Sequence, residues 1–152
     1  MLVTSGQGQQ LPLDKCLRSL TDGRRVSYST YARELAAQSG ASTRTCKDAI
    51  GVLNRAGYAD TFPVAGDARA KLYAISERGQ RVLAHRAGPT ILRYARKLFS
   101  TCASKRTLQQ RSGYCRGLEP ADALQRVETL ILTGGYAELI RQNLRAPDDA
   151  QR

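Results

Sequence analysis

Apolar residues recur at helical spacing in the N-terminal part of the chain, with turn-forming residues between the repeats. The pattern predicts helices over these ranges: Leu13 to about Leu20, Tyr31 to Gln38, and Ser42 or Thr43 to about Arg55. A turn signal at Thr21-Asp22-Gly23 ends the first helix. Ser29 or Thr30 is expected to cap the second helix, because a side-chain oxygen there can accept from a free backbone N–H. Gly40 and Gly57 are expected to end the second and third helices, where glycine tolerates a left-handed backbone.

An extended segment with a central turn follows. The pattern predicts a β-hairpin in three parts: a strand from Tyr58 to Val64, a turn from Ala65 to Ala68 and a strand from Arg69 to Ile75. Pro63 has no backbone N–H to donate, so the first strand must be short or lie at an edge. Ser76 is then expected to cap a helix from Glu77 to about Arg86, before the Gly88-Pro89 break.

The remainder of the chain is predicted to be helical. Breaks at Ser112-Gly113 and Gly134-Gly135 separate the expected helices, which are Pro89 to about Gln110, Pro120 to about Leu132, and Tyr136 to Leu144. The expected fold class is therefore mostly α with a small β-hairpin. The chain should divide into a flexible tail (1–10), a first domain (11–87), a helical region (88–145) and a second flexible tail (146–152).

The net charge points to a polyanionic partner. The 152 residues include 24 Lys and Arg against 13 Asp and Glu, a formal net charge of +11, and 41% are hydrophobic. Such a chain can fold and attracts DNA, RNA or an anionic surface, although the charge can also be no more than a solvated surface. No stretch approaches the ~20 apolar residues of a membrane span. The first residues lack the regions of a signal peptide, so we expect no membrane partner and a location in the bacterial cytoplasm, with the nucleoid or a plasmid.

The cysteines and the single histidine do not form a recognisable site in the sequence. Cys16, Cys46, Cys102 and Cys115 show no paired short spacing, and His85 is far from all of them, so we expect no metal and no cofactor. Cys16 and Cys46 are expected to be small buried hydrophobes. Cys102 and Cys115 leave a redox switch open. No catalytic constellation is present in the sequence, and an enzyme is not expected.

The segment from Ala32 to Ile50 resembles a helix-turn-helix. Ala36 is small where two helices would cross, and Gly40 lies in the tight turn. Ser42 can cap the second helix, while Cys46 and Ala49 would face the core. A short turn of this kind leaves the second helix protruding, so that it can enter a major groove.

The outward side of that second helix supplies the candidate DNA contacts, which are Ser42, Thr43, Arg44, Thr45, Lys47 and Asp48, with Gly51 a further outward position. Arg44 can reach guanine O6 and N7 together, and Thr43 can touch a thymine methyl or a phosphate. Lys47 can contact either a base edge or the backbone. Asp48 can accept from cytosine N4 or pair with Arg44 at i+4 spacing, and we favour the pair.

Two further stretches, Leu53 to Tyr58 and Tyr73 to Gly79, resemble the helix end and wing exit of MarR-like winged-helix regulators, with Ile75 and Ser76 departing from the usual residues. The resemblance covers residues 12–86 and implies a winged helix-turn-helix followed by C-terminal helices. It implies that Arg69 and Lys71 in the wing contact DNA, although a solvated hairpin tip is the alternative. The flanking candidates are Arg24, Arg25, Ser29 and Thr30.

These features together predict a sequence-specific regulator that binds double-stranded DNA, a repressor that reads an inverted repeat as a homodimer. The helices from Pro89 onward are the expected dimer contact, although their apolar stripe can equally be an intramolecular core. Their basic residues at 93, 96, 97, 105, 106 and 111 either extend the phosphate contacts or are solvated. A plasmid or phage DNA-binding adaptor and a protein-interaction module remain alternatives. RNA binding is disfavoured by the small number of exposed aromatic residues expected.

Overall fold

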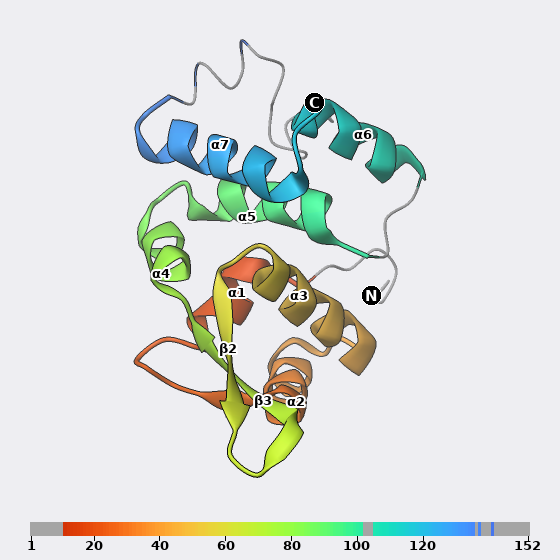
Figure 1. The fold of residues 1–152 in the computed structure, drawn as a ribbon, viewed down its shortest axis with the longest axis vertical. Helices are drawn as coiled ribbons and strands as arrows, with labels where there is room; N and C mark the ends of the chain where they lie inside the picture. The colour runs from red at the N-terminus through yellow and green to blue at the C-terminus, as the bar shows by residue number, and fades with distance from the viewer. Residues whose placement is uncertain (1–10, 102–104, 136, 138–140, 142–152) are drawn as a thin grey trace. The chain divides into compact units, whose positions relative to one another are not determined.

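The computed structural model describes residues 11–101, 105–135, 137 and 141 (Figure 1). The chain divides into two compact units, Met1–Gln80 and Arg81–Arg152, named the first and second unit from here on. Helices predominate, and a three-stranded antiparallel sheet lies in the first unit. The expected fold class, mostly α with a small β-hairpin, is confirmed at that level.

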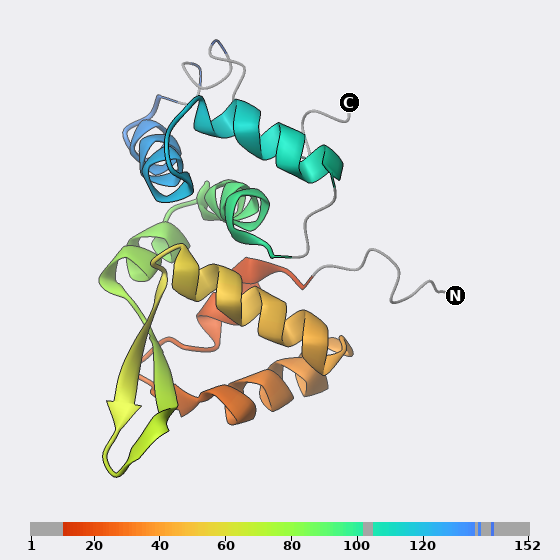
Figure 2. The ribbon, with the colours of Figure 1, turned by 45° about the vertical axis from the view of Figure 1, so that its right-hand side comes forward.

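The first unit contains these helices and strands in chain order: α1 (Leu13–Arg18), β1 (Val26–Ser27), α2 (Tyr28–Ser39), α3 (Thr43–Arg55), β2 (Ala59–Val64) and β3 (Asp67–Ile75). Helix α4 (Glu77–Ala84) runs across the boundary between the units. The strands pair in the order β1-β3-β2, which puts β2 at an edge, as Pro63 predicts. Figure 2 shows the β2–β3 hairpin extending beyond the helices of this unit.

The core of the first unit forms where α1, α2 and α3 pack together. Leu17 of α1, Tyr31 of α2 and Leu53 of α3 are completely buried. The Tyr31 hydroxyl donates a short hydrogen bond to the carbonyl oxygen of Cys16, so the buried phenol is satisfied and α1 is tied to α2. Cys16 and Cys46 are both completely buried, which confirms their prediction as small core residues. A helix as short as α1 depends on this packing, since isolated helices of such length are unstable.

The start of α2 differs from the sequence prediction. The helix begins at Tyr28 rather than Tyr31, and its N-cap is Ser27 rather than Ser29 or Thr30. Ser27 Oγ accepts from the Thr30 backbone N–H at 3.3 Å. The physical reason is β1: Ser27 pairs with Leu72 of β3 and so has the extended backbone (ψ 156°) that an N-cap needs. A strand of two residues is too short to show alternation in the sequence.

The hairpin turn is tighter than predicted. Val64 pairs with Asp67, so the turn is Ala65-Gly66 and β3 begins at Asp67 rather than Arg69. Gly66 has φ +81°, a conformation that glycine adopts without strain. The register shifts between Pro63 and Val64, because Pro63 cannot donate to the ladder.

The second unit contains α5 (Gly88–Phe99), α6 (Lys105–Cys115) and α7 (Pro120–Leu132). The single helix predicted from Pro89 to Gln110 is wrong, since α5 ends at Phe99 and Ser100 is extended (ψ 134°). The predicted break at Ser112-Gly113 is also wrong, because α6 runs through both residues to Cys115. It ends where Arg116 and Gly117 both take positive φ, +49° and +85°. The helix predicted from Tyr136 to Leu144 lies almost wholly outside the described residues.

The apolar stripe of α5 forms the core of the second unit. Ile91, Tyr94 and Leu98 of α5 are buried, as are Leu124 and Val127 of α7, and these two helices pack together. Helix α6 packs on both, and an edge-to-face contact between the Tyr94 and Tyr114 rings joins α5 to α6. Of the two roles left open for this stripe, the structure shows the intramolecular core. In the described ranges no helix combines the length and apolar character needed to cross a membrane.

Candidate nucleic-acid interface

A tight turn joins α2 to α3. Gly40 ends α2 in the left-handed conformation (φ +74°), and its N–H donates to the Ala36 carbonyl at 2.9 Å. Ser42 caps α3 by accepting from the Thr45 backbone N–H at 3.1 Å. Both positions were predicted from the sequence and are confirmed. The turn leaves α3 free to present one side to solvent.

Helix α3 has two distinct sides. Cys46, Ala49, Ile50 and Leu53 are completely buried, so the predicted inward side is confirmed. The exposed residues around its N-terminal half are Ser42, Thr43, Arg44 and Lys47, whereas Thr45 and Asp48 are half-buried. Ser42 Oγ also contacts Thr45 Oγ1 at 3.0 Å, so this pair serves the cap. Thr43, Arg44 and Lys47 are therefore the predicted contacts that the structure leaves accessible together.

Arg55, at the end of α3, was not among the predicted site residues. Its guanidinium folds back over Gly51, where an added Cβ would lie 2.8 Å from an Arg55 nitrogen. Gly51 follows Lys47 by four residues and Arg55 follows Gly51 by four, so Arg55 extends the basic surface along the same side of the helix. The absence of a side chain at Gly51 gives this guanidinium its place, a signal that the spacing of Gly51 and Arg55 could have provided.

A group of three side chains links α3 to the sheet and was also missed. The Lys47 ammonium lies over the Tyr28 ring, 5.8 Å from its centroid. The Tyr28 ring is 5.6 Å from the ring of Tyr73 in β3, with the planes inclined by 33°. These three residues, from α2, α3 and β3, are called the Tyr28 cluster. The second helix was predicted to begin at Tyr31, so Tyr28 lay outside every predicted element and no sequence signal pointed to this cluster.

The Tyr28 cluster carries no anion at neutral pH. Burial raises the pKa of the Tyr28 hydroxyl above its ordinary value. Burial raises the pKa of Tyr73 as well, and the neighbouring Tyr28 adds to this. Both phenols therefore stay protonated, and neither supplies a negative charge to Lys47.

The hairpin presents Lys71 on the same side of the sheet as the Tyr28 cluster. Tyr73 pairs with Thr61 and Lys71 pairs with Pro63, and alternate residues of a strand face the same side. Lys71 is exposed and lies about 6.7 Å along β3 from Tyr73, at the usual rise for two residues. Arg69 is also exposed, in the irregular part of the hairpin, where its backbone N–H donates to Asp67 Oδ1 at 3.0 Å.

Arg25 lies on the other side of the sheet. Its guanidinium stacks over Phe62, 4.0 Å from the ring centroid. Phe62 pairs with Leu72, which neighbours both Lys71 and Tyr73 and so faces the opposite side. The structure therefore does not bring Arg25 together with Lys71 and the Tyr28 cluster.

Arg24 is engaged within the protein. One of its guanidinium nitrogens lies 2.5 Å from both carboxylate oxygens of Glu34, and the other donates to the Ser19 carbonyl at 3.1 Å. This side chain ties the loop after α1 to α2. Ser29 is exposed in the first turn of α2, while Thr30 is half-buried against Ser27.

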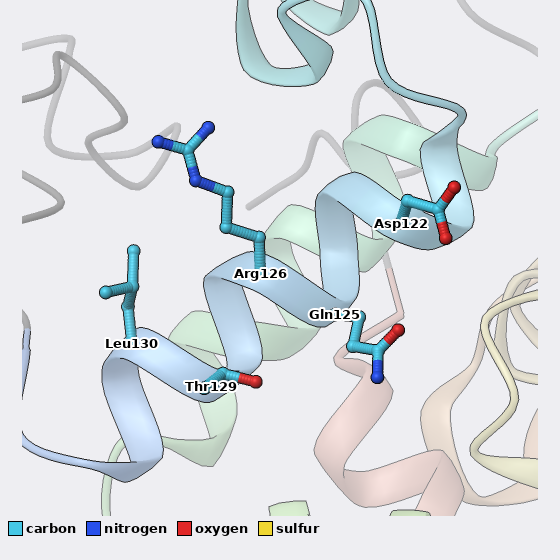
Figure 3. A pocket seen from close by; sticks show the side chains of 5 residues that line it. All are labelled: Asp122, Gln125, Arg126, Thr129 and Leu130. Carbon is cyan, nitrogen blue, oxygen red and sulfur yellow. The ribbon is translucent and has the colours of Figure 1, made fainter.

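Outside this candidate interface, the residues that the structure describes form a shallow depression but no metal site. No group of three or more His, Cys, Asp or Glu side chains suited to a metal occurs in the part of the chain that the structure describes. A shallow depression on the second unit is lined by Asp122, Gln125, Arg126, Thr129 and Leu130 (Figure 3). All five belong to α7, so the depression is an open helix surface among the described residues.

The redox switch expected from two cysteines stays a prediction, because Cys102 lies outside the described residues. Cys115 is buried, and this burial raises the pKa of its thiol, with Arg111 lowering it and Glu119 raising it further. A raised pKa leaves less of the reactive thiolate at neutral pH.

Comparison with protein-family models, curated proteins and solved structures found no match to this chain.

Proposed function

We propose that the first unit is a winged helix-turn-helix and that the protein binds double-stranded DNA through α3 and the β2–β3 hairpin. The element order, with a short strand before α2 and a hairpin after α3, supports this interpretation. The tight turn at Gly40 and the cap at Ser42 support it as well. A helix that protrudes next to such a turn is suited to the width of the major groove.

One observation carries the proposal: α3 buries one side completely while its N-terminal half exposes Thr43, Arg44 and Lys47. A helix that packed equally on all sides would have no surface left for a groove. Arg44 is the candidate for reading guanine, and Thr43 for a thymine methyl or a phosphate. Lys71 and Arg69 of the hairpin are candidates for the phosphate backbone. The pairing of Asp48 with Arg44 stays a prediction.

The four flanking candidates for DNA contact do not all fit the proposed interface. We leave Arg24 out of the proposed interface, because its guanidinium is bound by Glu34 and by the Ser19 carbonyl. We also leave out Arg25, which stacks on the opposite side of the sheet from Lys71. Ser29 remains, since an exposed hydroxyl in the first turn of α2 can contact a phosphate, and Thr30 next to it is a weaker candidate.

We further propose that the protein regulates transcription and represses by occluding a promoter, without a cofactor. Phosphate contacts would supply most of the affinity, consistent with a net charge of +11. The homodimer on an inverted repeat stays a prediction, since the apolar stripe that suggested it is buried within the second unit. Leu108 and Leu118, 49% and 41% exposed, are the larger aliphatic side chains left accessible in the described part of that unit.

The test is a selection of preferred duplexes from a random pool, followed by fluorescence anisotropy. The selected duplex and a scrambled version of it are titrated with the protein across a salt series. We expect tighter binding of the selected duplex and an affinity that falls steeply with salt for both. Light scattering of the free protein and of the complex gives the number of chains per duplex.

Each of the other outcomes would refute a different part of the proposal. Equal binding of both duplexes would leave a DNA-binding adaptor or architectural protein and would refute the regulator. An absence of binding at moderate salt would refute the DNA interface and leave the protein-interaction module. One chain on one half-site would refute the homodimer while leaving the DNA interface intact.

A further inference from the structure

We propose that Lys47 binds a backbone phosphate at the junction between α3 and the hairpin, and that Tyr28 is the positioning residue that holds its ammonium there. This inference rests on the proposed DNA-binding function and gives two residues of α3 different roles. Arg44 would read a base, and Lys47 would fix the position of the duplex. The sequence left both roles open for Lys47.

The direction of the Lys47 side chain is the first argument. Its ammonium lies over the ring of Tyr28, the first residue of α2, and that ring contacts Tyr73 of β3. The side chain therefore extends from α3 toward the start of α2 and the sheet. A lysine that reads a base edge projects away from the protein into the groove, whereas the Lys47 ammonium lies over the protein's own Tyr28 ring, beside the sheet.

The chemistry of the two groups is the second argument. An ammonium is a compact charge with three rotatable donors, which suits a phosphate, whereas the planar guanidinium of Arg44 suits the two acceptors of guanine. The face of an aromatic ring attracts a cation and restricts a side chain that is otherwise free in many rotamers. Tyr28 is 36% exposed, so the ring does not close the ammonium off from a ligand. Neither phenol of the cluster is ionised at neutral pH, so a phosphate meets no neighbouring negative charge from Tyr28 or Tyr73.

The position of Lys71 is the third argument. Lys71 lies on the same side of the sheet as Tyr73, two residues along β3. Positive side chains thus flank the ring pair, Lys47 on the α3 side and Lys71 on the hairpin side. This arrangement fits one DNA strand whose backbone passes over Tyr28.

The experiment combines a mutant cycle with a salt series. Variants Lys47→Ala, Tyr28→Leu, Tyr28→Phe and the double variant Lys47→Ala/Tyr28→Leu are titrated against the selected and the scrambled duplex. Lys47→Ala should weaken both duplexes by the same factor and reduce the salt slope by about 0.9, as expected for one phosphate. Tyr28→Phe keeps the ring and should bind as the wild type does. Tyr28→Leu should weaken both duplexes by the same factor, and should have no effect in the Lys47→Ala background.

Several results would overturn the inference while leaving the DNA-binding function in place. Loss of affinity in Lys47→Ala for the selected duplex alone would make Lys47 a base-reading residue. Additive effects of Tyr28→Leu and Lys47→Ala would show that Tyr28 does not act through Lys47. Failure of the wild-type protein to bind either duplex would refute the proposed function itself, and this inference with it.

If the Tyr28→Leu variant does not fold, a measurement on the free wild-type protein still tests the inference. The ε-methylene protons of Lys47 should be shifted upfield in the proton spectrum by the ring current of Tyr28. The same protons in Tyr28→Phe should remain shifted, because the ring is kept. Unshifted protons in the folded wild-type protein would overturn the positioning role of Tyr28.

Discussion

Gly79 of α4 lies directly against the backbone carbonyl of Tyr58, so that a Cβ at Gly79 would be 2.3 Å from that oxygen. Ser76 reinforces the contact, because its Oγ accepts from the Gly79 N–H at 2.9 Å and donates to the Gly57 carbonyl at 2.7 Å. The end of α3 and the start of α4 are therefore fastened to each other around the base of the hairpin. The stretches Leu53 to Tyr58 and Tyr73 to Gly79 meet at this contact.

The variant Gly79→Ala should lower the free energy of unfolding by about 1–3 kcal/mol, because the clash is with backbone and cannot be relieved by a side-chain rotation. Urea denaturation followed by circular dichroism measures this. Gly113→Ala is the matched control, since nothing lies within 4 Å of a Cβ there and the residue is inside α6. That control should gain up to about 1 kcal/mol from helix propensity. Equal effects of the two variants would contradict the close contact at Gly79.

The cap of α2 gives a second prediction. Ser27→Ala should cost about 1 kcal/mol of stability, because the Thr30 N–H loses its side-chain acceptor. Ser29→Ala should change stability by less than about 0.5 kcal/mol, as for other exposed positions. Thermal unfolding of both variants decides between the cap shown by the structure and the cap predicted from the sequence. A larger loss in Ser29→Ala would contradict the assignment of Ser27.

The proposed DNA contacts give a third prediction. Arg44→Ala should weaken binding of the selected duplex by about 1–3 kcal/mol and reduce its discrimination from the scrambled duplex. Lys71→Ala should weaken both duplexes alike, because a phosphate contact carries no sequence information. Anisotropy titrations measure both effects, with Lys15→Ala in α1 as an exposed, charge-matched control. Full discrimination by Arg44→Ala would refute the proposed base-reading role of Arg44.

The Arg24–Glu34 ion pair gives a fourth prediction. Arg24→Ala should change DNA affinity less than Lys71→Ala, because the Arg24 charge is already compensated inside the protein. Its cost in stability should be about 0–1 kcal/mol, since the two side chains are 37% and 34% exposed and the pair is screened by solvent. A loss of DNA affinity as large as that of Lys71→Ala would return Arg24 to the interface.

The parts of the structure that depend on neighbouring residues were predictable from the sequence. The left-handed end of α2 at Gly40 and the cap at Ser42 follow from local backbone chemistry. The buried side of α3 follows from helical periodicity, which places Cys46, Ala49 and Leu53 together. These features define the candidate groove-facing surface, so most of it could be inferred before the fold was known.

The parts that depend on pairing with distant residues were not predictable. Strand β1 exists because Val26 and Ser27 pair with Tyr73 and Leu72, far along the chain. The Tyr28 cluster needs the same pairing and so escaped detection. The break after Phe99 was hidden because apolar spacing continues beyond it, and α6 ends at a positive φ on Arg116, which is uncommon for a residue with a side chain.

Ser27 is at once the last residue of β1 and the N-cap of α2. No linker separates the sheet from the helix, so β1 and α2 are joined directly at this one residue. In the first turn of α2, the Tyr28 ring lies between β3 and Lys47. A single backbone residue thus sets both where β1 ends and where α2 begins, and the Tyr28 ring next to it joins that point to Lys47 of α3.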